Sequence, residues 1–311
     1  RRQRQMCIRD RCDVVILETG LGGTYDSTNA CGVPDVTVIA KIGFDHMAIL
    51  GDTLAQIAAE KAGIIKHGTA LVLESQEKEA MDVLNKAAER ADIKTIKVVN
   101  LDEIRILPQK DGKQCFSYAG YDAVTMKMLG VHQYENAVAA MLAAELFFEK
   151  YFAGKKNVPE RKALQHAIRE GIDRTQWMGR MELVSNDPFF LMDGAHNSNG
   201  VEALKKSLET MYPDEKFHFI MGVMADKDYG EMIRELLPLA LDFKTVTVES
   251  ERALQGEALA DCIREKGIPA EAYQNLADVL PDFSKSSTEK TVAFGSLYFI
   301  GEIEAFLQGK Q

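Results

Sequence analysis

Short, nearly continuous apolar runs are the feature that most restricts how this chain can fold. Each is followed by glycine or by polar residues, and they occupy 13–18, 36–40, 69–73, 189–192, 216–221 and 291–294. Runs of this length, with helical patterns between them, are typical of parallel strands that are buried on both faces. The sequence therefore predicts an α/β fold.

The order of the predicted elements indicates two domains. Further strands are expected at 96–99, 181–184 and 243–248, and helices at 53–61, 76–91, 132–150, 159–171, 199–211, 229–237, 257–266, 275–280 and from 297. Between 104 and 128 short alternating segments predict antiparallel hairpins. We expect a non-native or disordered leader over 1–12, a first domain over 13–176, and a smaller, doubly wound second domain over 180–311.

Charge and cysteine content narrow the class of protein. The net charge of −10 argues against binding to nucleic acid or to an acidic membrane. The five cysteines are scattered and contain no CxxC pair, which favours a reduced, cytoplasmic protein. No run approaches the ~18 apolar residues of a membrane span.

Polar residues that follow the first two strands are candidates for a metal site. Glu18 ends the run 13–18 and precedes a glycine-rich turn, while His46 follows the run 36–40. Ligands gather at the carboxyl edge of parallel sheets, and a carboxylate there suits Mg²⁺. The alternatives are a helix-capping glutamate and a hydrogen-bonded structural histidine.

Lys61 continues the apolar stripe of the helix that Thr53 and Gln56 are expected to cap. Ile57, Ala58 and Lys61 share one face of that helix. A buried lysine has a lowered pKa, and its neutral amine can form an anionic carbamate. A lysine that reaches water past the helix end is the alternative.

Three places later in the chain carry candidate ligand-binding groups. Asn136 lies in the first turn of a helix and can read a base edge or cap the helix; Arg180 lies at the domain junction and can reach a phosphate or form a surface ion pair. The segment DGAHNSNG, 193–200, joins a buried strand to a helix. Polar groups in such a turn predict a ligand.

Taken together, the motifs ETGLGGTYDSTN, KIGFDHMAILGDTLAQIAAEKAGIIK, GVHQYENAVAA, QWMGRME, DGAHNSNG and GSLYFIGE resemble folylpolyglutamate synthases that can also act as dihydrofolate synthases, a branch of the Mur ligases. The resemblance covers nearly everything after Asp13. It implies an incomplete P-loop-type nucleotide-binding domain, like the central domain of Mur ligases, followed by a Rossmann-like C-terminal domain.

The resemblance also implies roles for residues at matching positions. Glu18 and His46 match Mg²⁺ ligands, and Lys61 matches a carbamylated lysine, so that Lys61 and His46 are the implied catalytic residues. The residues implied to bind ATP are Asn136, Arg180, Asp193, His196 and Asn197. The residues implied to bind folate are Tyr25, Asp26 and Ser27. The implied reaction uses Mg²⁺, ATP, L-glutamate and folate or dihydropteroate, passes through an acyl phosphate, and is carried out by a monomer.

One family motif is absent from the sequence. The chain contains no GxxxxGK[ST] or GxxGK[ST] phosphate loop. We therefore expect this chain to be an incomplete fragment of a longer protein. Whether the fragment itself has ligase activity is an open question. Two other functions stay open: a Mur-type ligase of cell-wall precursors, and a non-catalytic protein that binds folate or a nucleotide.

Overall fold

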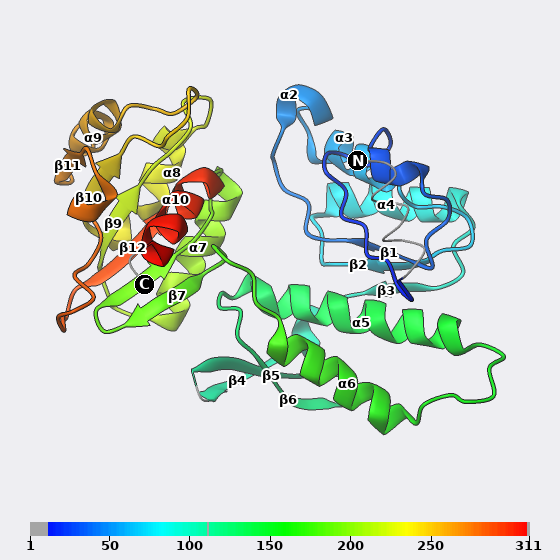
Figure 1. Cartoon of the computed structure of the whole chain (residues 1–311). Coiled ribbons are helices and arrows are strands. Elements are labelled where there is room, and N and C mark those ends of the chain that lie inside the picture. Colours follow the sequence, from blue (N-terminus) through cyan, green and yellow to red (C-terminus); the bar gives the residue numbers. More distant parts are fainter. Residues whose placement is uncertain (1–11, 111, 310–311) are drawn as a thin grey trace. The chain divides into compact units, whose positions relative to one another are not determined.

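The computed structural model describes residues 12–110 and 112–309 and divides into two compact units (Figure 1). Unit 1 contains residues up to 99 together with 139–157, and unit 2 contains 100–138 and 158–311. The leader expected over 1–12 lies almost entirely outside the described residues. The domain boundary expected near 176–180 stays a prediction, because the two units are defined by contacts and both sides of this boundary belong to unit 2.

Unit 1 is built on a three-stranded parallel sheet. Its strands are β1 (Val36–Ile39), β2 (Ala70–Leu73) and β3 (Ile96–Val98), in the order β1-β2-β3. The helices are α2 (Met47–Leu50), α3 (Leu54–Ala62), α4 (Lys78–Arg90) and the second part of α5 (His132–Phe152), with a short 3₁₀ helix at Ser27–Ala30. The strands at 36–40, 69–73 and 96–99 are confirmed to within one residue.

The core of unit 1 follows from one apolar face on each helix. Ile57 and Leu84, from α3 and α4, are fully buried against Leu71 and Leu73 of β2. Thr53 caps α3 by accepting from the Gln56 N–H, while the Gln56 side chain returns to the backbone of Thr53, so the expected capping box is confirmed.

The prediction of a strand at 13–18 is wrong. This segment has no regular secondary structure, and Ile16 is 93% exposed. An apolar run forms a buried strand only where a neighbouring strand pairs with it. Among the described residues the sheet of unit 1 ends at β1, and no strand pairs with 13–18.

Unit 2 begins with an antiparallel sheet of three strands, which confirms the expected hairpins. They are β4 (Arg105–Lys110), β5 (Lys113–Tyr118) and β6 (Tyr121–Met126), preceded by a 3₁₀ helix at Leu101–Glu103. Helix α6 (Arg161–Arg174) packs on β6. Asp173 of α6 fixes that contact, since it accepts from Lys113 Nζ at 2.7 Å and from Thr125 Oγ1 at 2.6 Å.

The larger sheet of unit 2 has the order β11-β10-β9-β12-β8-β7, and only β7 runs antiparallel to its neighbour. Its strands are β7 (Glu182–Asn186), β8 (Phe189–Met192), β9 (Phe217–Met221), β10 (Ala240–Val246), β11 (Ala270–Tyr273) and β12 (Lys290–Phe294). The helices are α7 (Ser198–Met211), α8 (Tyr229–Leu236), α9 (Gly256–Arg264) and α10 (Leu297–Gln308), with 3₁₀ turns at Leu237–Leu239 and Leu276–Asp278.

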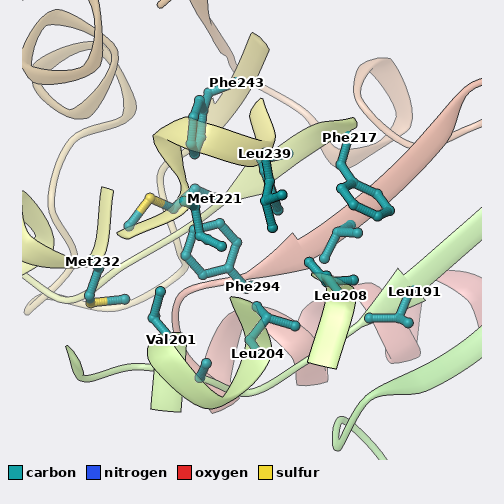
Figure 2. Close-up of a cluster of buried hydrophobic side chains, with 14 of the residues drawn as sticks. Leu191, Val201, Leu204, Leu208, Phe217, Met221, Met232, Leu239, Phe243 and Phe294 are labelled. Atoms are coloured by element: carbon teal, nitrogen blue, oxygen red, sulfur yellow. The ribbon is translucent and has the colours of Figure 1, made fainter. Parts of the chain in front are cut away.

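Helices cover both faces of this sheet, as the doubly wound prediction requires. One face contributes Phe219, Met221 and Phe294 to a core shared with α7, α8 and α9. Figure 2 labels Met221 and Phe294 in this core. The other face contributes Ile220 and Ala293 to a core with Phe299 and Ile303 of α10. Adjacent residues of one strand thus enter different cores, because side chains alternate along a strand.

Two details of unit 2 differ from expectation. The helix expected at 275–280 is a single 3₁₀ turn, and β11 was not expected. In the described ranges, 12–110 and 112–309, no helix combines the length and the apolar character that crossing a membrane requires.

Candidate functional site

The turn after β8 is built around the carboxylate of Asp193. Asp193 directly follows β8, which lies between β12 and the edge strand β7, and is only 7% exposed. Its Oδ2 accepts from the Met181 N–H and its Oδ1 from the Ala195 N–H, both at 2.8 Å. Burial raises the pKa of this carboxyl group, and the two N–H donors, Arg180 and His196 oppose that rise. Asp193 thus ties the turn after β8 to the segment that precedes β7.

His196 and Asn197 complete this turn. His196 Nδ1 lies 2.8 Å from the Gly194 carbonyl oxygen, so Nδ1 carries the hydrogen and Nε2 is left as an acceptor. Asn197 caps α7, since its Oδ1 accepts from the Gly200 N–H at 2.8 Å. Both side chains are half-buried. The turn therefore presents polar atoms in a fixed arrangement at the carboxyl edge of the sheet.

Arg180 lies directly beside the same turn. The Gly194 N–H donates to the Gly179 carbonyl oxygen at 2.7 Å. A Cβ on Gly194 would lie 3.3 Å from Arg180 Nη1 and 2.3 Å from Leu297 Cδ2, which explains why glycine stands there. The structure thus brings Arg180, Asp193, His196 and Asn197 together, and their contact with ATP stays a prediction.

The amino end of α5, which belongs to unit 2, carries the candidate residue Asn136. Asn136 is exposed, and its Nδ2 donates to Gln133 Oε1 at 3.0 Å. Asn136 therefore interacts within its own helix. Its neighbour His132 was not singled out from the sequence, although its imidazole lies close enough to Arg180 to be affected by its charge.

In unit 1 the glycine-rich segment folds around Asp26. Asp26 Oδ2 accepts from the Gly20 and Leu21 N–H groups at 3.0 and 3.1 Å, and Oδ1 accepts from the Thr28 N–H and hydroxyl at 2.8 and 2.6 Å. The hydroxyl and N–H of Thr28 contribute most to lowering the pKa of Asp26 to about 2. Asp26 is thus occupied by local hydrogen bonds.

The neighbours of Asp26 face outward. Tyr25 is 91% exposed, and Ser27 is exposed at the start of the 3₁₀ helix. The turn is attached to the end of α3, because the Thr24 N–H donates to the Glu60 carbonyl oxygen at 2.9 Å. A Cβ on Gly23 would lie only 2.6 Å from that same oxygen, so the close approach requires glycine.

The residues predicted to hold a metal lie on three separate segments of unit 1. Glu18 is exposed, and His46 is a left-handed residue before α2 whose Nε2 lies 3.9 Å from Asp45 Oδ2. Lys61 is half-buried, although Ile57 and Ala58 of the same helix face are fully buried. Within the part of the chain that the structure describes, no three His, Cys, Asp or Glu side chains form a group suited to a metal ion.

Sequence reasoning missed a buried carboxylate in unit 1. Glu74, directly after β2, is 3% exposed, and its Oε2 accepts from the Lys41 N–H at 2.7 Å. Gln76 Oε1 accepts from the Ile42 N–H at 2.8 Å. The sequence pattern that suggested Glu18, a carboxylate at the end of an apolar run, also fits Glu74. The strand before Glu74 is paired on both sides.

Comparison with known proteins assigns the fold of both parts of the chain. Residues 4–144 match the family described as Mur ligase middle domain. Residues 179–294 match the family described as Mur ligase, glutamate ligase domain. The fold and the site after β8 thus define a Mur ligase.

The similar curated and solved proteins carry related names. The Bacillus subtilis dihydrofolate synthase/folylpolyglutamate synthase is 34% identical over 310 residues, which cover 96% of this chain and 68% of that protein. The Lacticaseibacillus casei folylpolyglutamate synthase is 27% identical over 99% of this chain and 68% of its own length. The Mycobacterium tuberculosis folylpolyglutamate synthase, solved with ADP, has a TM-score of 0.79 and 28% identity over 96% of this chain and 68% of that chain. The chain belongs to the folylpolyglutamate synthase family.

Proposed function

We propose that this chain is the ligase part of an enzyme that uses ATP to join L-glutamate to folate. The observation that carries the proposal is the braced turn 193–197 beside Arg180, inside the region matched by the glutamate ligase domain. A structural relative with 26% identity and a TM-score of 0.75 over 98% of this chain is named as a complex with AMPPCP and folate. Those two ligands are the substrate classes that we assign to this chain.

In this proposal the nucleotide binds to polar groups of unit 2. Arg180 offers a cation and several N–H donors to phosphate oxygens. His196 Nε2 accepts from a hydroxyl or amino hydrogen, because its Nδ1 is already used. Asn136 offers an amide to the base, and Asn197 holds the amino end of α7. Asp193 positions these groups through its two N–H bonds.

The reaction requires a folate carboxylate to be activated and then attacked. The carboxylate oxygen attacks the γ-phosphorus of ATP, and ADP leaves. The amine of L-glutamate next attacks the carbonyl carbon of the acyl phosphate, phosphate leaves, and the amine loses a proton. Arg180 stabilises charge on the transferred phosphoryl group in this scheme.

Mg²⁺ would supply further neutralisation of the triphosphate. We keep Glu18, His46 and Lys61 as proposed ligands, with Lys61 as a carbamate, on the strength of the resemblance alone. No step of the reaction is assigned to the metal. Tyr25, Asp26 and Ser27 are proposed for folate, and Asp26 acts there by holding the turn that presents exposed Tyr25.

The test is a ligation assay with isotopically labelled L-glutamate, Mg-ATP and either folate or dihydropteroate, analysed by mass spectrometry. The proposal expects a folate product heavier by one glutamyl group, and loss of that product in Arg180→Gln. Two curated relatives are named for both dihydrofolate and folylpolyglutamate synthesis, which is why dihydropteroate is included. A product from cell-wall precursors alone, or nucleotide binding without any turnover, would favour the two other functions.

A further inference from the structure

His132, the first residue of α5, has no part in the function proposed above. Its ring lies in a narrow slot in unit 2. A Cβ on Gly130 would lie 2.8 Å from His132 Cε1 and 3.3 Å from Met181 Cγ, and Gly130 itself has a φ of +109°. Only glycine leaves room for the ring beside Met181, the residue next to Arg180.

The hydrogen bonds of the ring define its tautomer. Gln133 Nε2 lies 3.0 Å from His132 Nε2, and Gln133 Oε1 accepts from Asn136 Nδ2 at 3.0 Å. An amide nitrogen can only donate, so His132 Nε2 accepts and the ring hydrogen is on Nδ1. A polar chain therefore runs from Asn136 through Gln133 to the imidazole.

The other ring nitrogen has no hydrogen-bond partner. Within residues 12–110 and 112–309, His132 Nδ1 is buried and unpaired. Burial lowers the pKa of His132, and the positive charge of Arg180 lowers it further. Unpaired buried polar atoms are uncommon in native proteins and need an explanation.

We propose that His132 is a positioning residue for Arg180. Its ring holds the segment that contains Arg180 and Met181 against the amino end of α5, where Asn136 lies. The proposal rests on the proposed function, in which Arg180 and Asn136 contact opposite ends of one nucleotide. The uncharged ring fills the slot between Gly130 and Met181 without repelling Arg180. The cation is then kept at the turn 193–197.

The first test does not need a nucleotide. The ring signals of His132 are followed by NMR in the wild-type chain and in Arg180→Gln, with His166, exposed on α6, as the internal control. The expected result is an Nδ1–H tautomer at neutral pH and a rise in the pKa of His132 alone when the guanidinium is removed. An unchanged His132 pKa, or an Nε2–H tautomer, would overturn the proposal.

The second test is a double-mutant cycle read by binding of Mg-AMPPCP in calorimetry. His132→Leu should weaken binding by about tenfold in the wild-type background and have almost no effect in Arg180→Gln, because coupled residues give non-additive losses. His132→Gln, whose amide oxygen can accept from Gln133 in place of Nε2, should recover part of the loss, while His166→Leu should change nothing. Equal losses in both backgrounds would show that His132 does not act through Arg180.

The two tests separate failure of this inference from failure of the proposed function. If wild type and Arg180→Gln bind Mg-AMPPCP equally, the assignment of Arg180 to the nucleotide is wrong and the positioning role falls with it. The ring signals still decide whether His132 and Arg180 are neighbours. If Arg180→Gln weakens binding and His132→Leu does not, the proposed function stands and this inference fails.

Discussion

The turns at 20–27 and 193–197 both follow an apolar run and both contain an aspartate that accepts backbone N–H groups. Asp193 is 7% exposed and braces the turn after β8, a strand that is paired on both sides. Asp26 lies at the surface and braces a turn whose preceding run is unpaired and exposed. The same sequence signal therefore gives a rigid, desolvated site only where its strand is paired on both sides.

The largest effect is expected from Asp193→Ala. It leaves the Met181 and Ala195 N–H groups buried without an acceptor, and should lower the free energy of unfolding of unit 2 by about 3 kcal/mol. Chemical denaturation with probes in each unit measures this. Asp26→Ala removes three N–H bonds and one O–H bond, but water can replace them there, so stability should change much less. Equal losses would contradict the comparison.

Gly194→Ala should have the next largest effect. The added methyl group would meet Leu297 Cδ2 at 2.3 Å and Arg180 Nη1 at 3.3 Å. Forcing these groups apart should destabilise unit 2 by about 2 kcal/mol and weaken Mg-AMPPCP binding. Gly301→Ala is the matched control, because Gly301 lies within α10 and a Cβ there meets nothing within 4 Å. That control should stabilise the chain by up to about 1 kcal/mol in thermal unfolding.

Thr53→Ala should have a smaller effect, confined to unit 1. It removes one half of the capping box on α3 and should cost about 1 kcal/mol of stability. Amide hydrogen exchange should show faster exchange in the first turn of α3 and no change in α7. Faster exchange in unit 2 would mean that the two units do not unfold separately.

The smallest effect is the pH response of the 20–27 turn. The folded pKa of Asp26 is about 2, below its ordinary value of 3.8. The bonds of its carboxylate therefore favour the folded turn above pH 3.8, and their contribution disappears as the pH falls through about 2. Carbon NMR titration of Asp26 measures this, and Thr28→Val should raise its pKa because Thr28 provides the largest contributions. A pKa of Asp26 at its ordinary value would contradict the hydrogen bonds described here.

The sequence predicted most of unit 2 because its strands are central and its helices have one apolar face. It missed β11, which pairs only with β10 and is no more than half-buried, so its pattern Ala-Glu-Ala-Tyr carries little apolar signal. It placed a strand at 13–18 because composition does not tell whether a partner strand is present. Asp193, His196 and Asn197 lie within a few residues of one strand end, whereas Arg180 precedes β7 and is brought to them by the pairing of β7 with β8.

The remaining parts of the site could not be predicted because they depend on packing. His132 and Met181 both lie against Gly130, whose backbone is left-handed, and a one-dimensional pattern does not encode that packing. Glu74 and Glu18 both end or follow an apolar run in the sequence, but only the run before Glu74 forms a strand, which is paired on both sides.

The most direct test of the central claim is to titrate the 311-residue chain with Mg-AMPPCP and follow its backbone amide NMR signals. We expect saturable binding, with the largest shifts at Arg180 and in the turn 193–197, and loss of those shifts in Arg180→Gln. Absence of binding, or binding that leaves the turn 193–197 unperturbed, would contradict the claim that unit 2 carries the nucleotide site.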